Sequence, residues 1–427
     1  MWKQVAKGTS ILFVGAVINK FFTIAYRYLA MRYLKVEEYG TFALIMSFTV
    51  FVLAFGHFYS GTALSRWIAR THDQEERKRL FANSMFLTLI SSVTISPLLL
   101  WFFMKNVPFM KFNLFIIFCG FIALALMDVI KGALRGLLKW INSVSVDILF
   151  SLFKLVLIAL GIWVYSGLVS LNLILTIYFG AGILSFALSI GFIKGYVSKL
   201  WQLLDRNILL RLFQFSKNLT LSWMCLYGMS FYSRWILSRT SSVNTALYDG
   251  AFVFYSFFQM LTGAINTAVI PSSASVYFEN EGKTTTYNRS ELSLIYKLVQ
   301  KTFGFLLAVI LLFYIVHYLR IDKIIFHLLK LDKFYGSLSV MLIVVWALPF
   351  EFYYNIGSGL LIGKGKSDLV LKVSALALVW HLLITLMMNY FWGLTGVAFG
   401  YVFTVVFLFL VLMIEFKKGI HGEESTS

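Results

Sequence analysis

The chain has 427 residues, of which 59% are hydrophobic and only 13% are charged, and its mean hydropathy is +0.81. A water-soluble domain carries about 25% charged residues, so this composition excludes a soluble enzyme and indicates a chain whose solvent is lipid. The net charge of +18 is spread over short loops between apolar stretches. Contact with anionic membrane lipids explains this distribution, and a nucleic-acid partner is not expected.

Apolar stretches of about 20 residues, the length that crosses a bilayer as a helix, recur twelve times along the chain. They lie near residues 9–31, 40–64, 81–104, 112–131, 146–167, 172–194, 213–237, 245–270, 297–320, 336–362, 368–391 and 394–416, with the junction at 120–145 the least clear. Twelve spans leave both termini on one side. Because lysine and arginine are enriched in the loops on that side, we predict cytoplasmic termini and a multi-pass protein of the cytoplasmic (inner) membrane.

The two halves of the sequence look like copies. Each half places two arginines five residues apart in or after its first span and a tyrosine and glycine soon afterwards. The matching residues are Arg27, Arg32 and Tyr39-Gly40 in the first half, and Arg234, Arg239 and Tyr248-Asp249-Gly250 in the second. Six spans per half give both copies the same orientation, so the repeat is parallel, about an axis along the membrane normal.

This repeat divides the chain at its polar connections. We expect an N-terminal lobe of six helices over 1–195, an inner connecting segment over 196–212, a C-terminal lobe of six helices over 213–418 and a cytoplasmic tail over 419–427. The predicted fold is therefore an all-α polytopic membrane protein. A second long polar connection is expected at 271–296.

Two cations inside the first span, Lys20 and Arg27, are the strongest functional signal. A cation at the centre of a spanning helix costs about 3 to 17 kcal/mol, depending on the reference. Seven residues make two helical turns, so both heads emerge from one face. They predict a polar chamber that recognises an anion, with Arg offering a forked donor and Lys a point charge. The alternative is snorkelling of the side chains to the membrane surface, which suits Arg27 better than Lys20.

Two further cations are candidate substrate ligands. Arg234 takes the position of Arg27 in the second half, so the two could clamp one polyanion from both lobes; the alternative is an interfacial anchor. Lys154 lies in the fifth span, seven residues after Asp147, either as a wall residue of the chamber or as part of an intrahelical charge set.

Glu351 stands deep in the tenth span, two residues after Pro349, which should kink the helix. A buried carboxyl group could bind and release a proton during transport, or it could pair with Lys20 or Lys154. Asp128, Asp249, His57, His317 and His381 are weaker candidates. The sequence holds no nucleotide-binding loop, hydrolase elbow or paired cysteine ligands, so we expect no cofactor, no metal and no catalytic residue.

Five segments carry a resemblance to a known family. They are Arg32–Gly40, Gly61–Ala69, Leu134–Leu137, Gly363–Lys366 and Gly393–Ala398. In this order, over about residues 8 to 415, they resemble the polysaccharide-transporter, or Wzx-type, flippases of the multidrug/oligosaccharidyl-lipid/polysaccharide exporter superfamily. Relatives often carry an acid before the arginine of span seven; Ser233 stands there instead.

The resemblance implies two six-helix lobes, as in the multidrug and toxin extruders (MATE), around a cationic cavity with alternating access. It further implies a flippase for an undecaprenyl-pyrophosphate-linked oligosaccharide, such as an O-antigen repeat unit, with a glycan polymerase or ligase as a possible partner. Three alternatives remain at this stage. They are a MATE-type multidrug or cation antiporter, a lipid II flippase, and a membrane-bound glycan polymerase or ligase.

Overall fold

A computed structural model describes residues 2–107, 113–165, 169–197, 200–256, 258–259, 304, 306–308, 310–363 and 365–424. Every element in these residues is helical. The first half contains α1 (Trp2–Tyr33), α2 (Val36–His57), α3 (Ser60–Arg70), α4 (Gln74–Asn106), α5 (Leu114–Gly136), α6 (Trp140–Val164), α7 (Leu171–Ser189) and α8 (Lys194–Val197). The second contains α9 (Arg206–Thr240), a helix over 242–256, α12 (Ile321–Leu328), α13 (Ser337–Val344), α14 (Leu348–Gly363) and α15 (Ser367–Glu424).

Eight described helices are long and apolar enough to cross a membrane, which makes this a multi-pass membrane protein. The last of them, within α15, holds two successive spans joined at Gly393. Three further predicted spans, near 213–237, 245–270 and 297–320, coincide in the described residues with the long helix α9, the helix over 242–256 and a shorter apolar helix over 306–318. The expected connection at 271–296 lies outside the described residues.

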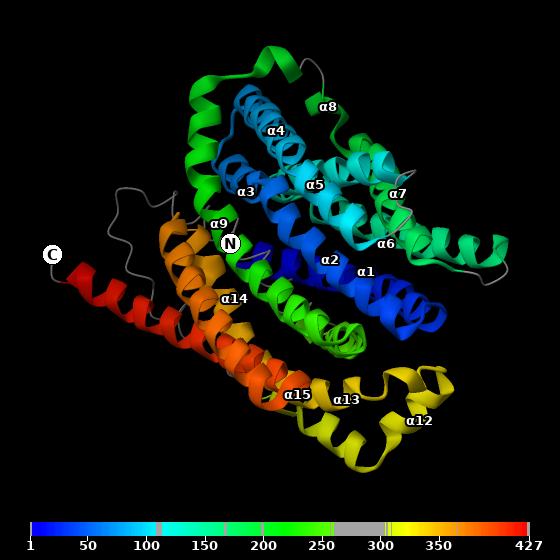
Figure 1. The fold of residues 1–427 in the computed structure, drawn as a ribbon. Helices are drawn as coiled ribbons and strands as arrows, with labels where there is room; N and C mark the ends of the chain where they lie inside the picture. The colour runs from blue at the N-terminus through cyan, green and yellow to red at the C-terminus, as the bar shows by residue number, and fades with distance from the viewer. Residues whose placement is uncertain are drawn as a thin grey trace.

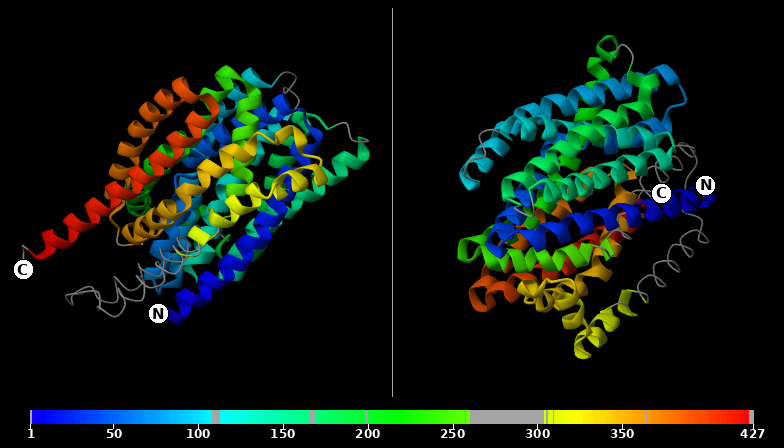
Figure 2. Two further views of the ribbon diagram at one scale, coloured as in Figure 1. Left: turned by 90° about the horizontal axis from the view of Figure 1, so that it is seen from below. Right: turned by 90° about the vertical axis from the view of Figure 1, so that its right-hand side faces the viewer.

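Two lobes are visible in Figure 1, with α1–α7 on one side, α13–α15 on the other and α9 running between them. Within the N-terminal lobe α1 packs on α6, and α5 packs on α7 and α3. Within the C-terminal lobe α9 packs on α15, and the two lobes meet along α2 and α9. Both termini lie at the same end of the bundle, as Figure 2 shows. We call this the terminal end and the other the distal end.

Three helices are interrupted within or beside predicted spans. The stretch predicted over 40–64 is wrong as one helix, because Phe58 and Tyr59 adopt left-handed φ angles of 47° and 43° and separate α2 from α3. Before Pro349 a short 3-10 segment, Val345–Ala347, separates α13 from α14, which confirms the predicted kink. Gly393, with φ 55° and ψ −127°, divides α15 where the sequence predicts the boundary between the last two spans.

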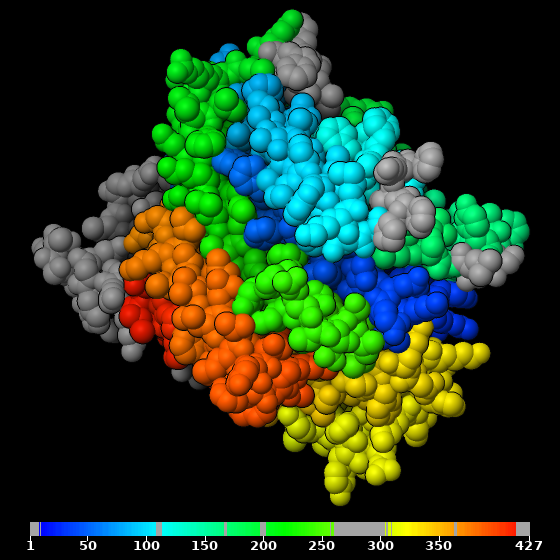
Figure 3. Space-filling model, viewed as in Figure 1, coloured from blue at the N-terminus to red at the C-terminus, as the bar shows by residue number. Residues whose placement is uncertain are grey.

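The lobes contact each other at the distal end, where Figure 3 shows them packed together. They also meet nearer the terminal end, where Phe58 stacks on Phe213 and Tyr59 on Trp223. The α1–α2 connection meets the start of the helix over 242–256, and Gly40 lies so close to the backbone of Ser242 that a Cβ atom would overlap it. The Lys333 ammonium donates to the Leu34 carbonyl oxygen at 2.6 Å. Burial at this contact lowers the pKa of Lys333, against the opposing effect of Glu37 and Glu38.

Candidate functional site

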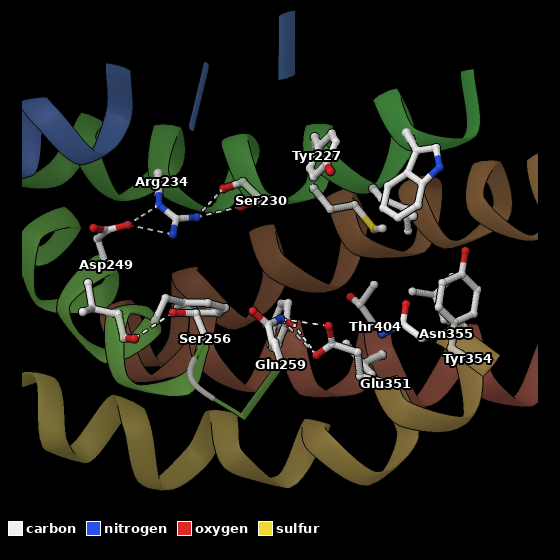
Figure 4. A pocket seen from close by; sticks show the side chains of 18 of the residues that line it. Tyr227, Ser230, Arg234, Asp249, Ser256, Gln259, Glu351, Tyr354, Asn355 and Thr404 are labelled. Atoms are coloured by element: carbon white, nitrogen blue, oxygen red, sulfur yellow. Dashed lines mark hydrogen bonds and ion pairs between the residues drawn. The ribbon is translucent and has the colours of Figure 1, made fainter. Parts of the chain in front are cut away.

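A cavity of about 370 Å³ lies between the lobes, and its walls come from α1, α9, the helix over 242–256, α14 and α15. It extends from the distal contacts toward the terminal end, back along α1 from Arg27 to Lys20 and along α9 from Arg234 to Trp223. Figure 4 shows the part of this wall that belongs to the C-terminal lobe. Four of the five candidate residues line it: Lys20, Arg27, Arg234 and Glu351.

An ion cluster closes the distal end of the cavity. Arg27 Nη1 lies 2.5 Å from Asp249 Oδ2, across the lobe boundary. Arg234 binds the other oxygen of the same carboxylate through Nε at 3.0 Å and Nη2 at 2.8 Å. The Tyr39 hydroxyl donates to Asp249 at 2.9 Å. The predicted proximity of Arg27 and Arg234 is therefore found, but the anion between them belongs to the protein.

The geometry of Arg234 is fixed on both sides of its guanidinium. While Nε and Nη2 bind Asp249, Nη1 donates to the Ser230 hydroxyl at 2.7 Å and to the Ser230 carbonyl oxygen at 3.1 Å, as Figure 4 shows. Such charge-assisted contacts, one of them forked, are the strongest hydrogen bonds available to a side chain. Arg234 is only 7% exposed, so in this structure it is a cavity residue held by Asp249 and Ser230.

Lys20 lies two turns from Arg27 on the same helix and faces the same cavity. Within the described residues no carboxylate lies within ion-pair distance of its ammonium. Its charge is thus directed at the cavity contents and not at a neighbouring acid.

Glu351 sits in the C-terminal wall among neutral hydrogen-bond donors. Its carboxylate accepts from the Tyr255 hydroxyl at 2.6 Å, from Gln259 Nε2 at 2.8 and 3.1 Å and from the Tyr401 hydroxyl at 3.4 Å. It forms no ion pair with Lys20 or Lys154 in the described residues, so the structural pairing considered from the sequence is not found. A carboxyl group in neutral surroundings can exchange a proton without breaking an ion pair.

Lys154 lines a different, smaller cavity inside the N-terminal lobe. Its partner is not Asp147 as the intrahelical charge set would require, because that carboxylate pairs with Lys131 Nζ at 3.1 Å. The structure therefore separates Lys154 from the other four candidates.

Aromatic rings form much of the cavity wall toward the terminal end. Trp223 stacks on Tyr59 at 5.3 Å between ring centroids and on Tyr227 at 5.5 Å. Tyr354 also faces the cavity, and its hydroxyl hydrogen-bonds Ser374 at 3.2 Å. Flat ring faces with a few hydroxyl groups offer both apolar contact and hydrogen bonds to a ligand.

Several site residues escaped the sequence analysis. The sequence analysis placed Asp249 among the weaker candidates and named Tyr39 only as part of the repeat. Each residue precedes a glycine in the two matching segments, and this shared position is the sequence signal that could have identified them. Gln259, Tyr255 and Tyr401, which hold Glu351, gave no signal at all. His381, fully buried, bonds Ser233 at 3.0 Å and Thr404 at 2.8 Å, which agrees with a packing role. The described residues contain no cluster of ligands suited to a metal ion.

Comparisons with known proteins agree with the helical architecture. A family model described as "Polysaccharide biosynthesis protein" matches residues 5–277. A mutant of the Vibrio cholerae MATE transporter VcmN is similar in structure, with a TM-score of 0.73, 16% identity and coverage of 98% of this chain and 97% of that one. No curated protein matches the sequence.

Two further similar structures are of multidrug resistance MATE family transporters of the MOP superfamily in different states. An outward-facing structure of a multidrug resistance MATE family transporter aligns with a TM-score of 0.74, 15% identity and coverage of 99% and 96%. An inward-facing structure aligns with a TM-score of 0.74, 16% identity and coverage of 98% and 99%. At these identities the likeness shows the fold, while the family model covers well over half of the chain. The chain thus belongs to the polysaccharide biosynthesis protein family and has a MATE-like fold.

Proposed function

We propose that the protein is a flippase that moves an undecaprenyl-pyrophosphate-linked oligosaccharide across the cytoplasmic membrane by alternating access. The observation that carries this proposal is the cavity between the lobes, where Lys20 presents a charge without a resident carboxylate beside the Arg27–Asp249–Arg234 cluster. A pyrophosphate group is recognised by this set of forked and point-charge donors. The family match to polysaccharide biosynthesis supports the same substrate class.

The remaining parts of the substrate fit the rest of the cavity. Sugars present hydroxyl groups and flat apolar faces, which suit the ring faces of Trp223, Tyr227 and Tyr354. With cytoplasmic termini, the cavity extends from the ion cluster toward the cytoplasm, where such oligosaccharides would be loaded. The lipid tail stays in the bilayer. A polymerase or ligase outside would consume the product, which makes it the expected functional partner.

Transport is proposed to draw on an ion gradient through Glu351. The carboxylate faces the cavity and is held by neutral donors in the described residues. Protonation would weaken its acceptance of the Tyr255 and Tyr401 hydroxyls, which belong to two different helices. Such a change can shift the balance between two arrangements of the C-terminal lobe.

The test is Lys20→Ala in a strain whose own copy of the gene is deleted, with surface glycan measured by blotting and protein level measured in the membrane fraction. Loss of a contact to a charged group lowers affinity by about tenfold or more, so surface glycan should fall by at least that factor at a normal protein level. Lys194→Ala, an exposed lysine of α8 outside the cavity, is the matched control. Wild-type glycan in the Lys20 variant would refute the site.

The runner-up is a MATE-type antiporter of drugs or cations, which the fold and the two cavity carboxylates, Asp249 and Glu351, favour. The same strains separate the two functions. Deletion should remove surface glycan and leave the sensitivity to cationic drugs unchanged. A drug-sensitive deletion strain with normal glycan would favour the antiporter.

A further inference from the structure

The N-terminal lobe contains its own cavity, of about 260 Å³, apart from the one between the lobes. Its wall is formed by α1, α2, α5, α6 and α7. Thr23 of α1 lines both cavities, and its hydroxyl meets that of Ser151 on α6 at 3.0 Å, while Ser151 also bonds Asn19. A thin partition of polar side chains therefore stands between the two spaces.

Lys154 is the unusual group in this wall. It is only 5% exposed, and its Nζ lies 4.2 Å from the centroid of the Phe150 ring and 5.5 Å from that of Tyr178. No carboxylate lies within ion-pair distance of it in the described residues, because the nearby Asp147 is held by Lys131. Aromatic faces attract a cation but do not neutralise it, so the ammonium lacks the counter-charge that a buried ion needs.

The charges around the cavity decide what kind of ligand fits. Lys131 and Asp147 cancel each other, and Asp128 lies 3.9 Å from Lys131 and not beside Lys154. His57 also lines the wall. Outside the wall, Lys20 and Arg27 of α1 lie close enough for their charges to act on Lys154, and Arg27 is paired with Asp249. Among the residues that line the cavity, the pair of Lys131 and Asp147 leaves one positive charge, on Lys154. It matches a singly charged group better than a phosphate carrying two negative charges.

The volume of the cavity and the residues that line it suit a ligand larger than a single ion. At about 30 Å³ per water molecule, the cavity is too large for a single halide. The wall carries hydroxyl and amide groups from Asn19, Thr23 and Ser151 and the rings of Phe150 and Tyr178. A wall that offers both hydrogen-bonding groups and flat apolar faces suits a sugar ring.

We propose that this cavity is a second binding site, for a sugar residue that carries a carboxylate, with the carboxylate on Lys154 and the ring between the polar and aromatic walls. This inference rests on the proposed function: the sugar belongs to the transported oligosaccharide and enters the site from the cavity between the lobes, past Thr23. The oligosaccharide would then be held at two points, by its pyrophosphate between the lobes and by an acidic sugar inside the N-terminal lobe.

The experiment measures thermal unfolding of the purified full-length protein with D-glucuronate, D-glucose or acetate. A ligand that binds the folded state raises the melting temperature. We expect glucuronate to raise it, neutral glucose to have no effect at the same concentration, and acetate to have much less effect. Lys154→Met should weaken glucuronate binding by about tenfold or more. Lys194→Met, which removes an exposed lysine outside both cavities, should retain it.

Three results would overturn the proposal. They are an unchanged melting temperature of the wild type with glucuronate, an equal shift in Lys154→Met, and acetate acting as well as glucuronate. Since Lys154→Met removes an unpaired buried charge, the ligand-free variant should be at least as stable as the wild type. The measurement needs no transport, so it stands apart from the glycan test of Lys20→Ala.

Discussion

Asp249 is the residue on which the arrangement of charges in the cavity depends. It is 3% exposed and pairs with Arg27 and Arg234 at once, one from each lobe, so its single negative charge offsets one of their two positive charges. Without it, the buried guanidinium of Arg234 and the half-buried one of Arg27 would face each other with no counter-charge, and an uncompensated buried charge is strongly destabilising. The carboxylate therefore allows both arginines to remain within a membrane span while the cavity is free of substrate.

The substitution Glu351→Gln keeps the shape of the side chain and tests whether Glu351 couples transport to a proton gradient. In Glu351→Gln the amide oxygen can still accept a hydrogen bond from Tyr255, so the protein should fold, but the side chain can no longer bind a proton. We expect transport in vesicles to lose its response to an imposed pH gradient. Glu415→Gln, which changes a carboxylate paired with Lys372 far from the cavity, should retain the response. An unaltered response in Glu351→Gln would leave this residue a structural role only.

The cations of the site were readable from the sequence because a charge inside an apolar span is conspicuous. Lys20, Arg27 and Arg234 were placed in one cavity on that signal, and the structure agrees. Their partners were not readable. Asp249 lies near a span's start, where an acid is unremarkable, and Gln259 reaches Glu351 across 92 residues of sequence. Lys154 was assigned to the same chamber because sequence position alone cannot tell which face of α6 borders which cavity.

Breaks within helices set the shape of the C-terminal lobe. Pro349 lacks an amide hydrogen, and the preceding 3-10 segment accommodates it. Gly393 adopts a φ of 55° that other residues rarely accept. Both breaks follow from residue type and could be predicted. The break at Phe58 and Tyr59 could not, since two aromatic residues with left-handed φ angles carry no sequence signal of a turn.

The contact between Gly40 and the start of the helix over 242–256 is sensitive to a single added methyl group. A Cβ on Gly40 would overlap the Ser242 carbonyl group, which is backbone and cannot rotate away. Overpacking of this kind costs about 1–3 kcal/mol, so Gly40→Ala should lower the melting temperature of the purified protein. Gly180→Ala in α7 is the control, because a Cβ there meets nothing within 4 Å and alanine favours a helix. Equal stability of the two variants would contradict the close contact.

Three side-chain contacts join the two lobes at the distal end. They are the contacts Arg27–Asp249, Lys333–Leu34 and Tyr28–Leu329. The sequence predicted two lobes and their parallel repeat. It could not predict how they dock, because these contacts pair residues more than 200 positions apart, and two of the three use backbone oxygens, which any sequence supplies.

Asp249→Asn tests whether the ion cluster holds the lobes together. The amide cannot neutralise Arg27, so the distal contact should weaken and the distance between the lobes should become longer and more broadly distributed. Spin labels at Lys35 and Leu328, both exposed and on opposite lobes, report this distance by double electron–electron resonance once Cys119 and Cys225 are replaced by serine. Asp322→Asn, which breaks a contact with His317 inside one lobe, should leave it unchanged. An unchanged distance distribution in Asp249→Asn would mean that other contacts between the lobes hold them together.

A carboxylate built into the chamber also acts as a permanent competitor. Asp249 is held 2.5 Å from Arg27 by the fold. Its effective concentration at Arg27 is therefore higher than that of dissolved acetate or chloride, so these ions compete poorly for the guanidinium. We therefore expect a ligand with several negative charges to displace Asp249 more readily than a monovalent ion does. Within the described residues no carboxylate pairs with Lys154, because Asp147 is held by Lys131, so a singly charged ligand would meet no such competitor in the smaller cavity.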